Sequence, residues 1–195
     1  MNSRAVVLSR LRSQKRASAQ LPDGRFGTQC IDIAKQFVEN TKIVGGDCIK
    51  VTDSGALGTA VREFKHYKTA TKVFSQIPAI TGNVDLDALT NPRELADIDL
   101  AILPGRFAVG ENAAVWLDLG CLGPHRAIFV IAQHLALVVG SDHIVATMHD
   151  AYEQANLTKH DFGVFVSGPS KTADIEQSLV VGAHGPRTCS VFLVG

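Results

Sequence analysis

The run Ala127-Ile-Phe-Val-Ile-Ala-Gln-His-Leu-Ala-Leu-Val-Val-Gly140 is the longest apolar stretch of the chain, and it decides the class of fold. Only Gln133 and His134 interrupt it, and each half is far shorter than the roughly 20 apolar residues that span a bilayer. Short continuous apolar runs are typical of strands buried in a parallel sheet. We therefore predict buried strands over 127–132 and 135–139, and we expect His134 to be an interior histidine with satisfied hydrogen bonds.

Strands and helices alternate on both sides of this run. The expected strands cover 48–51, 71–77, 97–103, 113–117, 162–166 and 189–194, and the expected helices cover 29–42, 53–67, 141–155 and 172–181. This order predicts a three-layer α/β fold with a largely parallel sheet and flanking helices. We expect one domain over 1–195, with 1–42 as an N-terminal helical segment packed on it. Small-molecule sites in such sheets are expected beyond the carboxyl ends of the strands.

Charge and cysteine content narrow the class of protein. The 195 residues carry nineteen Lys and Arg against nineteen Asp and Glu. A formal charge of zero argues against general binding of nucleic acid or of anionic membranes. The four cysteines are scattered, and no pair has the CxxC spacing of a zinc or iron–sulfur site. We expect a cytoplasmic protein that neither inserts into a membrane nor holds a metal or other cofactor itself.

The N-terminus combines basic residues with an apolar stripe of Val7, Leu8 and Leu11. This composition is typical of a transit peptide, and equally of a helix that docks through its stripe and exposes a basic face. We favour the docked helix. Its basic residues precede any acidic one: Arg4, Arg10, Arg12, Lys15 and Arg16.

The first candidate site is the segment Phe162-Gly-Val-Phe-Val-Ser-Gly-Pro-Ser-Lys-Thr-Ala-Asp-Ile-Glu176. It predicts a strand, a short Gly/Pro/Ser loop and then a helix, whose N-terminal amides could bind an anion. An ordinary capped helix explains the same residues, because acids in the first turns stabilise a helix start. The candidate ligand-binding residues here are Ser167, Gly168, Pro169, Ser170, Thr172, Asp174 and Glu176.

Two further segments offer side chains for catalysis. In Gly182-Ala-His-Gly-Pro-Arg187, His184 could transfer protons, and Arg187 could bind a carboxylate or phosphate. Gly185 is a further candidate ligand-binding residue. A helix cap and a surface arginine are the structural alternative. Glu111 lies in a loop of small residues between two apolar strands, where partial burial would make it a nucleophile or an acid/base. A structural carboxylate that accepts loop amides is the alternative there.

The twenty-one residues Ser167-Gly-Pro-Ser-Lys-Thr-Ala-Asp-Ile-Glu-Gln-Ser-Leu-Val-Val-Gly-Ala-His-Gly-Pro-Arg187 resemble the LUD-domain family, specifically its lactate-utilisation protein C (LutC/YkgG) group. Val7-Leu-Ser-Arg-Leu-Arg12 is similar to that group's N-terminal helix. Gly110-Glu-Asn-Ala113 stands where many members carry an Ala-Glu-Thr-Gly motif. It is also similar to the Ser-Glu-Asn-Gly signature of some CoA-transferases, whose glutamate accepts the acyl group.

The resemblance implies a fold of the NagB/RpiA/CoA-transferase type and a role in the oxidation of L-lactate to pyruvate. It also implies iron–sulfur partner proteins, LutA-like and LutB-like, which would carry the clusters. The leading hypothesis is therefore a component of a lactate-utilisation system. A second is an enzyme or sensor that binds a small carboxylate or phosphate at the residues named above, with Glu111 and His184 as candidate catalytic residues. The third is acyl transfer through Glu111 as nucleophile.

Overall fold

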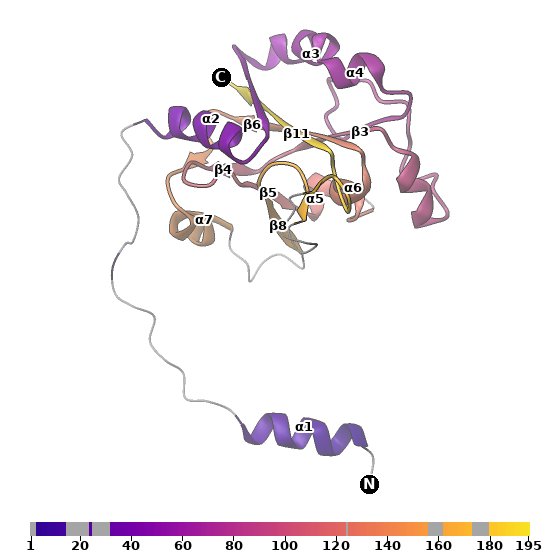
Figure 1. Cartoon of the computed structure of the whole chain (residues 1–195), viewed down its shortest axis with the longest axis vertical. Helices are drawn as coiled ribbons and strands as arrows, with labels where there is room; N and C mark the ends of the chain where they lie inside the picture. Colours follow the sequence, from indigo (N-terminus) through magenta and orange to yellow (C-terminus); the bar gives the residue numbers. More distant parts are fainter. Residues whose placement is uncertain (1–2, 15–23, 25–31, 124, 156–161, 173–179) are drawn as a thin grey trace.

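The computed structural model describes residues 3–14, 24, 32–123, 125–155, 162–172 and 180–195. Five parallel strands form its central sheet (Figure 1). From one edge to the other they are β1 (Asp47–Val51), β11 (Thr188–Val194), β6 (His134–Gly140), β3 (Leu100–Pro104) and β2 (Val73–Ser75). The apolar run 127–140 thus supplies the middle strand, and the predicted parallel sheet is confirmed.

The two faces of this sheet pack against different partners. Leu100 and Ile102 of β3 lie in one cluster with Leu57 and Val61 of α3 (Ser54–Glu63), which is followed by α4 (Lys65–Thr69). Ala101 and Leu103 alternate with these residues along β3, point to the other face of the sheet and belong to the larger core. That core includes residues of α2 (Ile33–Ile43), α5 (Leu119–Leu122), α6 (Ile128–Ile131) and a second sheet. The result is the predicted three-layer α/β arrangement, with α3 and α4 on one side of the sheet (Figure 1).

The second sheet has four strands and is mostly antiparallel. Trp116 packs there with Phe107 and Phe165 in a third apolar cluster, beneath Ala151 and Ala155 of α7 (Met148–Ala155). The loops that carry Glu111 and Ser167 follow two strands of this small sheet, β4 and β8 respectively. Its strands, in order, are β7 (Ile144–Val145), β4 (Phe107–Val109), β5 (Val115–Asp118) and β8 (Gly163–Val166).

Local capping explains where several helices begin. The Asp53 side chain accepts from the backbone N–H of Ala56 at 2.9 Å and so caps the N-terminus of α3. Asp118 caps α5 through the N–H of Cys121 at 3.1 Å, and it also accepts from Arg106 Nε at 2.8 Å. Burial raises the pKa of Asp118, but its bonds to Arg106 and Cys121 outweigh burial and leave that pKa below its usual value. A 3-10 helix, η1 (Pro92–Asp97), leads into β3.

Two helix and strand predictions around the central run are wrong. Residues 127–132 form α6 instead of a strand: Ile131 N–H donates to the carbonyl of Ala127 at 3.0 Å. A run of six apolar residues fits a buried helix turn as well as a strand, so periodicity could not separate them. The helix predicted from Ser141 begins at Met148, because the chain first turns at Gly140 and pairs β7 with β4.

The helix predicted over 172–181 is also wrong at both ends. Lys171 and Thr172 form β9 (Lys171–Thr172), which pairs antiparallel with β10 (Val180–Val181). Gly182 follows with φ +74° as a turn residue and does not end a helix. Asp174 and Glu176, predicted on that helix, lie outside the described residues.

The N-terminal helix α1 (Ser3–Ser13) buries none of its side chains and lies apart from the sheets (Figure 1). The docking expected for this segment, and the single domain over 1–195, therefore stay predictions. Among the described residues, each helix is too short or too polar to cross a membrane.

Candidate functional site

The loop after β8, Ser167–Lys171, joins two other segments that the sequence singled out. Ser167 Oγ donates to the Asn112 carbonyl at 2.6 Å, which ties the loop to the segment that carries Glu111. Ser170 N–H donates to the Pro186 carbonyl at 2.9 Å, and Gly182 N–H donates to the Ser170 carbonyl at 2.9 Å. The loop therefore stands between the Glu111 segment and the turn that carries His184 and Arg187.

Gly168 lets this loop approach the C-terminal end of α2. Its φ is +71°, in the left-handed region, and a Cβ built there would lie 2.5 Å from the carbonyl oxygen of Val44. Lys171 Nζ donates to the same carbonyl, which satisfies an acceptor that the helix end leaves open. Only a residue without a side chain fits at position 168, so the loop's shape depends on that glycine.

A cavity of about 310 Å³ opens beside the loop. Its walls are mostly apolar, and the Ser167 and Ser170 side chains and the loop backbone add polar groups. Four of the predicted binding residues line it. The full lining is Phe129, Val130, Phe165, Val166, Ser167, Gly168, Pro169, Ser170, Lys171 and Pro186.

The cavity lies at the amino ends of the parallel strands, whereas the site was predicted at their carboxyl ends. Pro186 precedes Thr188, the first residue of β11, and Val44, against the loop, precedes β1. These are the amino ends of parallel strands, whereas a site at the carboxyl ends was expected. The reason is that β8 does not belong to the parallel sheet: it pairs antiparallel with β5 in the second sheet, and the loop after it meets the segments that precede β1 and β11.

Glu111 is exposed, so the partial burial predicted for it is wrong. Its backbone is held firmly: its N–H donates to the Ala146 carbonyl at 3.1 Å, and its carbonyl accepts from Asn40 Nδ2 at 2.9 Å. The alternative, a structural carboxylate that accepts loop amides, stays a prediction. The structure brings its loop to Ser167 through Asn112, without joining Glu111 directly to His184 or Arg187 by any bond among the described residues.

His184 and Arg187 are both exposed at the turn before β11. Arg187 N–H donates to the Gln133 carbonyl at 2.8 Å, which fixes the backbone and leaves the guanidinium at the surface. Gly182 lies against the stem of Arg187, since a Cβ at Gly182 would be 2.7 Å from Arg187 Cγ. Gly185 packs on Ser170 in the same way, since a Cβ at Gly185 would be 2.8 Å from Ser170 Cβ.

A histidine pair near this edge was not predicted. His134 stacks on His66 of α4 with ring centroids 3.9 Å apart, and its Nδ1 lies 2.9 Å from Thr188 Oγ1. His134 is half-buried and hydrogen-bonded, as expected in part. Burial lowers the pKa of His134, and the charges of His66 and Arg187 lower it further. Sequence spacing gives no signal for this pair, because His66 and His134 are far apart in the sequence and come together only in the folded protein.

The cysteines and acidic residues do not form a metal centre in the described part of the chain, where no group of three potential ligands comes together. Burial raises the pKa of Cys121 to about 11 and that of Cys189 to about 12. Thiols held protonated in this way are poor nucleophiles. Cys30 lies outside the described residues.

These features define an α/β protein with a ligand-sized cavity at the amino ends of its parallel strands. Residues 34–194 match the LUD domain family, and the chain belongs to that family. A DUF162 family protein from Deinococcus radiodurans, known from a crystal structure, shares the fold with a TM-score of 0.64 at 22% identity. The superposition covers 87% of this chain and 100% of that one.

Curated relatives carry the name lactate utilization protein C. The one from Deinococcus radiodurans is 33% identical over 126 residues, 61% of this chain and 59% of its own length. The one from Exiguobacterium sp. is 37% identical over 111 residues, 52% of this chain and 47% of its own length. The chain thus spans about half the length of these relatives.

Proposed function

We propose that this protein takes part in lactate utilisation and that its contribution passes through the cavity beside Ser167–Lys171. The observation that supports this most is the coincidence of four predicted binding residues with that cavity. The names of the curated relatives supply the pathway. Iron–sulfur proteins, LutA-like and LutB-like, are the proposed partners, as the resemblance of residues 167–187 to the LutC group implies.

The cavity is larger than lactate needs. Its volume of about 310 Å³ equals the share of about ten water molecules in liquid, whereas lactate has only six non-hydrogen atoms. Its apolar walls also suit a ligand with an apolar body better than a hydroxy acid alone. The proposed ligand is therefore a larger anionic metabolite, whose charge would be met by Arg187 and His184 on the turn that supplies Pro186 to the cavity wall.

This reading favours the enzyme-or-sensor hypothesis as the second candidate and leaves acyl transfer through Glu111 without support. An acyl-glutamate must be shielded from water, or it hydrolyses. Glu111 is exposed, and its loop meets the cavity only through Asn112.

A thermal-shift screen tests the binding site. The full chain is heated with lactate, pyruvate, nucleotides, acyl-CoAs and sugar phosphates. A ligand at about 100 times its Kd adds roughly 2.7 kcal/mol of stability and raises Tm visibly. Arg187→Ala should abolish the shift without lowering the ligand-free Tm, because the side chain is exposed; Arg62→Ala, on α3, is the matched control. An unchanged shift in Arg187→Ala contradicts the placement of the site.

A genetic experiment tests the pathway. Deletion of the gene in its native host should prevent growth on L-lactate while leaving growth on pyruvate intact. Gentle purification of the tagged chain from that host should bring down proteins that contain iron and acid-labile sulfide. Normal growth on L-lactate would overturn the proposed role, and clean isolation of the chain would overturn the partnership.

A further inference from the structure

The charges of this neutral chain are divided between its N-terminus and its folded body. The first 31 residues hold six basic side chains and one acidic one, Asp23. The remaining 164 residues therefore hold thirteen basic and eighteen acidic side chains. A segment of net charge +5 is tethered to a body of net charge −5, which favours their association.

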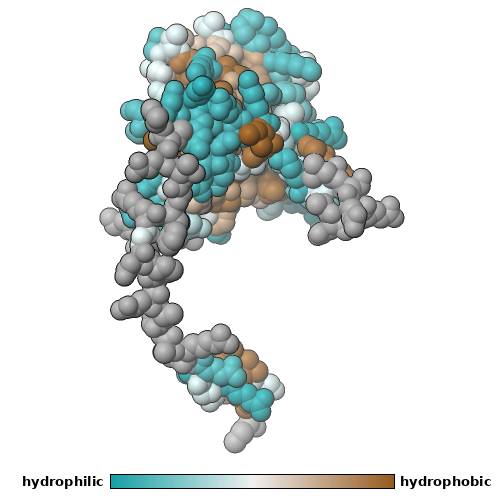
Figure 2. All heavy atoms as spheres, turned by 60° about the vertical axis from the view of Figure 1, so that its left-hand side comes forward, coloured by the Kyte–Doolittle hydropathy of each residue, from teal (hydrophilic) through white to brown (hydrophobic). Residues whose placement is uncertain are grey.

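Helix α1 presents a stripe that is both apolar and basic. Arg4, Val7, Leu8 and Leu11 follow the spacing of one helix face. Val7 is 55% exposed and Leu11 is 61% exposed, and Figure 2 shows hydrophobic surface on α1. Because an arginine interrupts the apolar stripe, a purely apolar surface would leave that charge poorly solvated. An apolar groove with carboxylates on its rim can bury the apolar side chains and pair with the arginine.

The segment that joins β2 to β3 forms such a groove. Its hollow measures about 520 Å³, and its apolar floor includes Val84, Leu89 and Ile98. Three carboxylates line it as well, whereas its one cation, Lys72, is ion-paired with Asp97 at 3.1 Å. The carboxylates are those of Asp85, Glu94 and Asp97.

The chain is long enough to bring helix and groove together. Eighteen residues separate Ser13 from Asp32, and they can span at most about 60 Å. A body of this size has a radius of gyration of about 15 Å, so every point on its surface is within reach. A tether of this length also gives the helix a high effective concentration at its own body, above that of any second copy in dilute solution.

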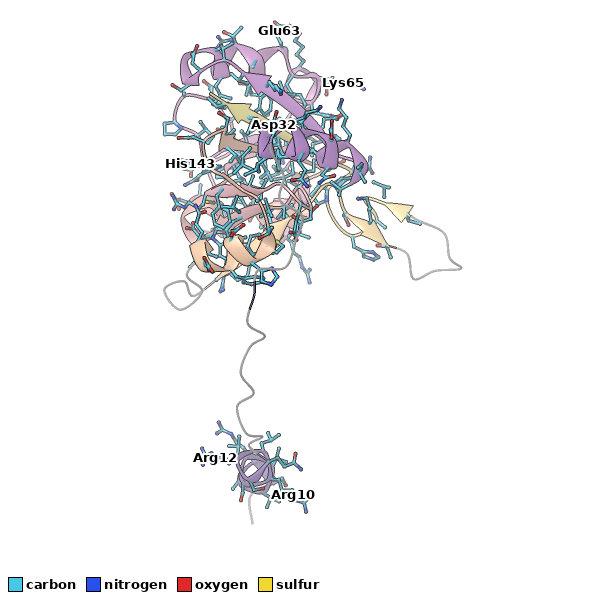
Figure 3. The ribbon with its side chains drawn as sticks, turned by 90° about the vertical axis from the view of Figure 1, so that its left-hand side faces the viewer. Arg10, Arg12, Asp32, Glu63, Lys65 and His143 are labelled. Carbon is cyan, nitrogen blue, oxygen red and sulfur yellow. The ribbon has the colours of Figure 1, made fainter. Side chains whose placement is uncertain are left out.

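We propose that α1 docks in this groove of its own chain, with Val7, Leu8 and Leu11 on the apolar floor and its arginines at the acidic rim. Arg10 and Arg12 project from opposite sides of α1 (Figure 3), so charge is available along both margins of the buried stripe. Docking covers a surface far from the cavity, and it holds or fails independently of the proposed function.

Photo-crosslinking of the full chain tests this. With Leu11→p-benzoylphenylalanine, the adducts should fall within 71–98 of the same chain, as shown by mass spectrometry on a mixture of isotope-labelled and unlabelled chains. The same photoreactive residue at Ser9, on the opposite side of the helix, should give few adducts there. Raising the salt from 50 to 500 mM should lower the yield, since the rim contacts are screened.

A groove variant provides the second readout. Ala88 is exposed and lines the hollow, so Ala88→Arg adds bulk and positive charge without removing a contact of the fold. It should lower the crosslink at least about five-fold, by steric and charge repulsion. Thr90→Arg, exposed but outside the hollow, is the control. Adducts outside 71–98, adducts between copies, or equal yields in Ala88→Arg and Thr90→Arg would each overturn the proposal.

Discussion

Gly168→Ala should destabilise the protein, because the loop beside the cavity approaches the end of α2 at this glycine. The backbone there has φ +71°, and the left-handed conformation costs an alanine about 1–2 kcal/mol. The new Cβ would lie 2.5 Å from the Val44 carbonyl oxygen and 3.0 Å from Val44 Cγ2. Because the nearest atom is backbone, relief needs movement of the end of α2, at a cost of about 1–3 kcal/mol.

Against this cost stands the entropy that alanine removes from the unfolded chain, about 0.4–1 kcal/mol. The net loss is therefore about 2–4 kcal/mol. Gly58→Ala is the matched control: Gly58 lies inside α3, and the nearest atoms to its Cβ are at 3.6 and 3.8 Å. There the same chemical change should stabilise by about 0.5–1 kcal/mol, because alanine favours the helix.

Urea unfolding measures both variants against the wild type. With a slope m of about 1–3 kcal/mol/M, the two midpoints should differ by more than about 1 M urea. Since both variants exchange hydrogen for methyl, their unfolded states change alike and the comparison isolates the folded state. A Gly168→Ala protein as stable as Gly58→Ala would refute the close approach of the loop to α2.

Three further outcomes follow from the described contacts. Asp118→Asn should cost about 2–3 kcal/mol in urea unfolding at pH 7, since it removes a charge-assisted bond from Arg106; the loss should begin to shrink below about pH 4, where the unfolded wild-type chain takes up a proton at this carboxyl, and should disappear only below the lowered pKa of the folded state. The lowered pKa of His134, stacked on His66, means that the folded state takes up fewer protons than the unfolded state just below pH 6.5. Stability should therefore fall from pH 7 to pH 5, and His134→Gln should flatten that fall; an unchanged slope would contradict the assignment. The buried Cys189 thiol, with its pKa raised to about 12, should resist iodoacetamide at pH 8 until urea unfolds the chain, whereas rapid labelling of the native protein would contradict its burial.

The central sheet was predictable because each of its strands is a short apolar run with a clear end. Leu135–Val139 and Cys189–Val194 are examples, and both lie in the middle of the sheet. Residues 127–132 were equally apolar and formed a helix, since burial alone does not select between a strand and a helix turn. The α/β class predicted that the strands would be largely parallel, but it did not predict their order in the sheet.

The candidate site was predictable in composition but not in position. The loop Ser167–Ser170 was identified from its Gly/Pro/Ser content, and it does line a cavity. Its contact with Val44 depends on residues distant in sequence, so no local pattern could reveal it. The pairing of β9 with β10 was missed because the segment 172–181 has an apolar spacing that fits a helix. The site was expected at the carboxyl ends of the parallel strands, but β8 pairs with β5 in the second sheet, and the loop after β8 meets the segments that precede β1 and β11.

The residues of the site divide into two kinds, and this division makes its function testable. Gly168 and Pro169 shape the loop and are packed against α2 or buried, so their loss should damage fold and binding together. His184 and Arg187 are exposed, so their loss should damage binding alone. These two exposed side chains contribute little to folding, because the loss of a surface side chain of this kind changes the free energy of unfolding by only a few tenths of a kcal/mol. A ligand role therefore predicts lost binding with an unchanged Tm for both exposed residues, an outcome that a purely structural turn could not produce.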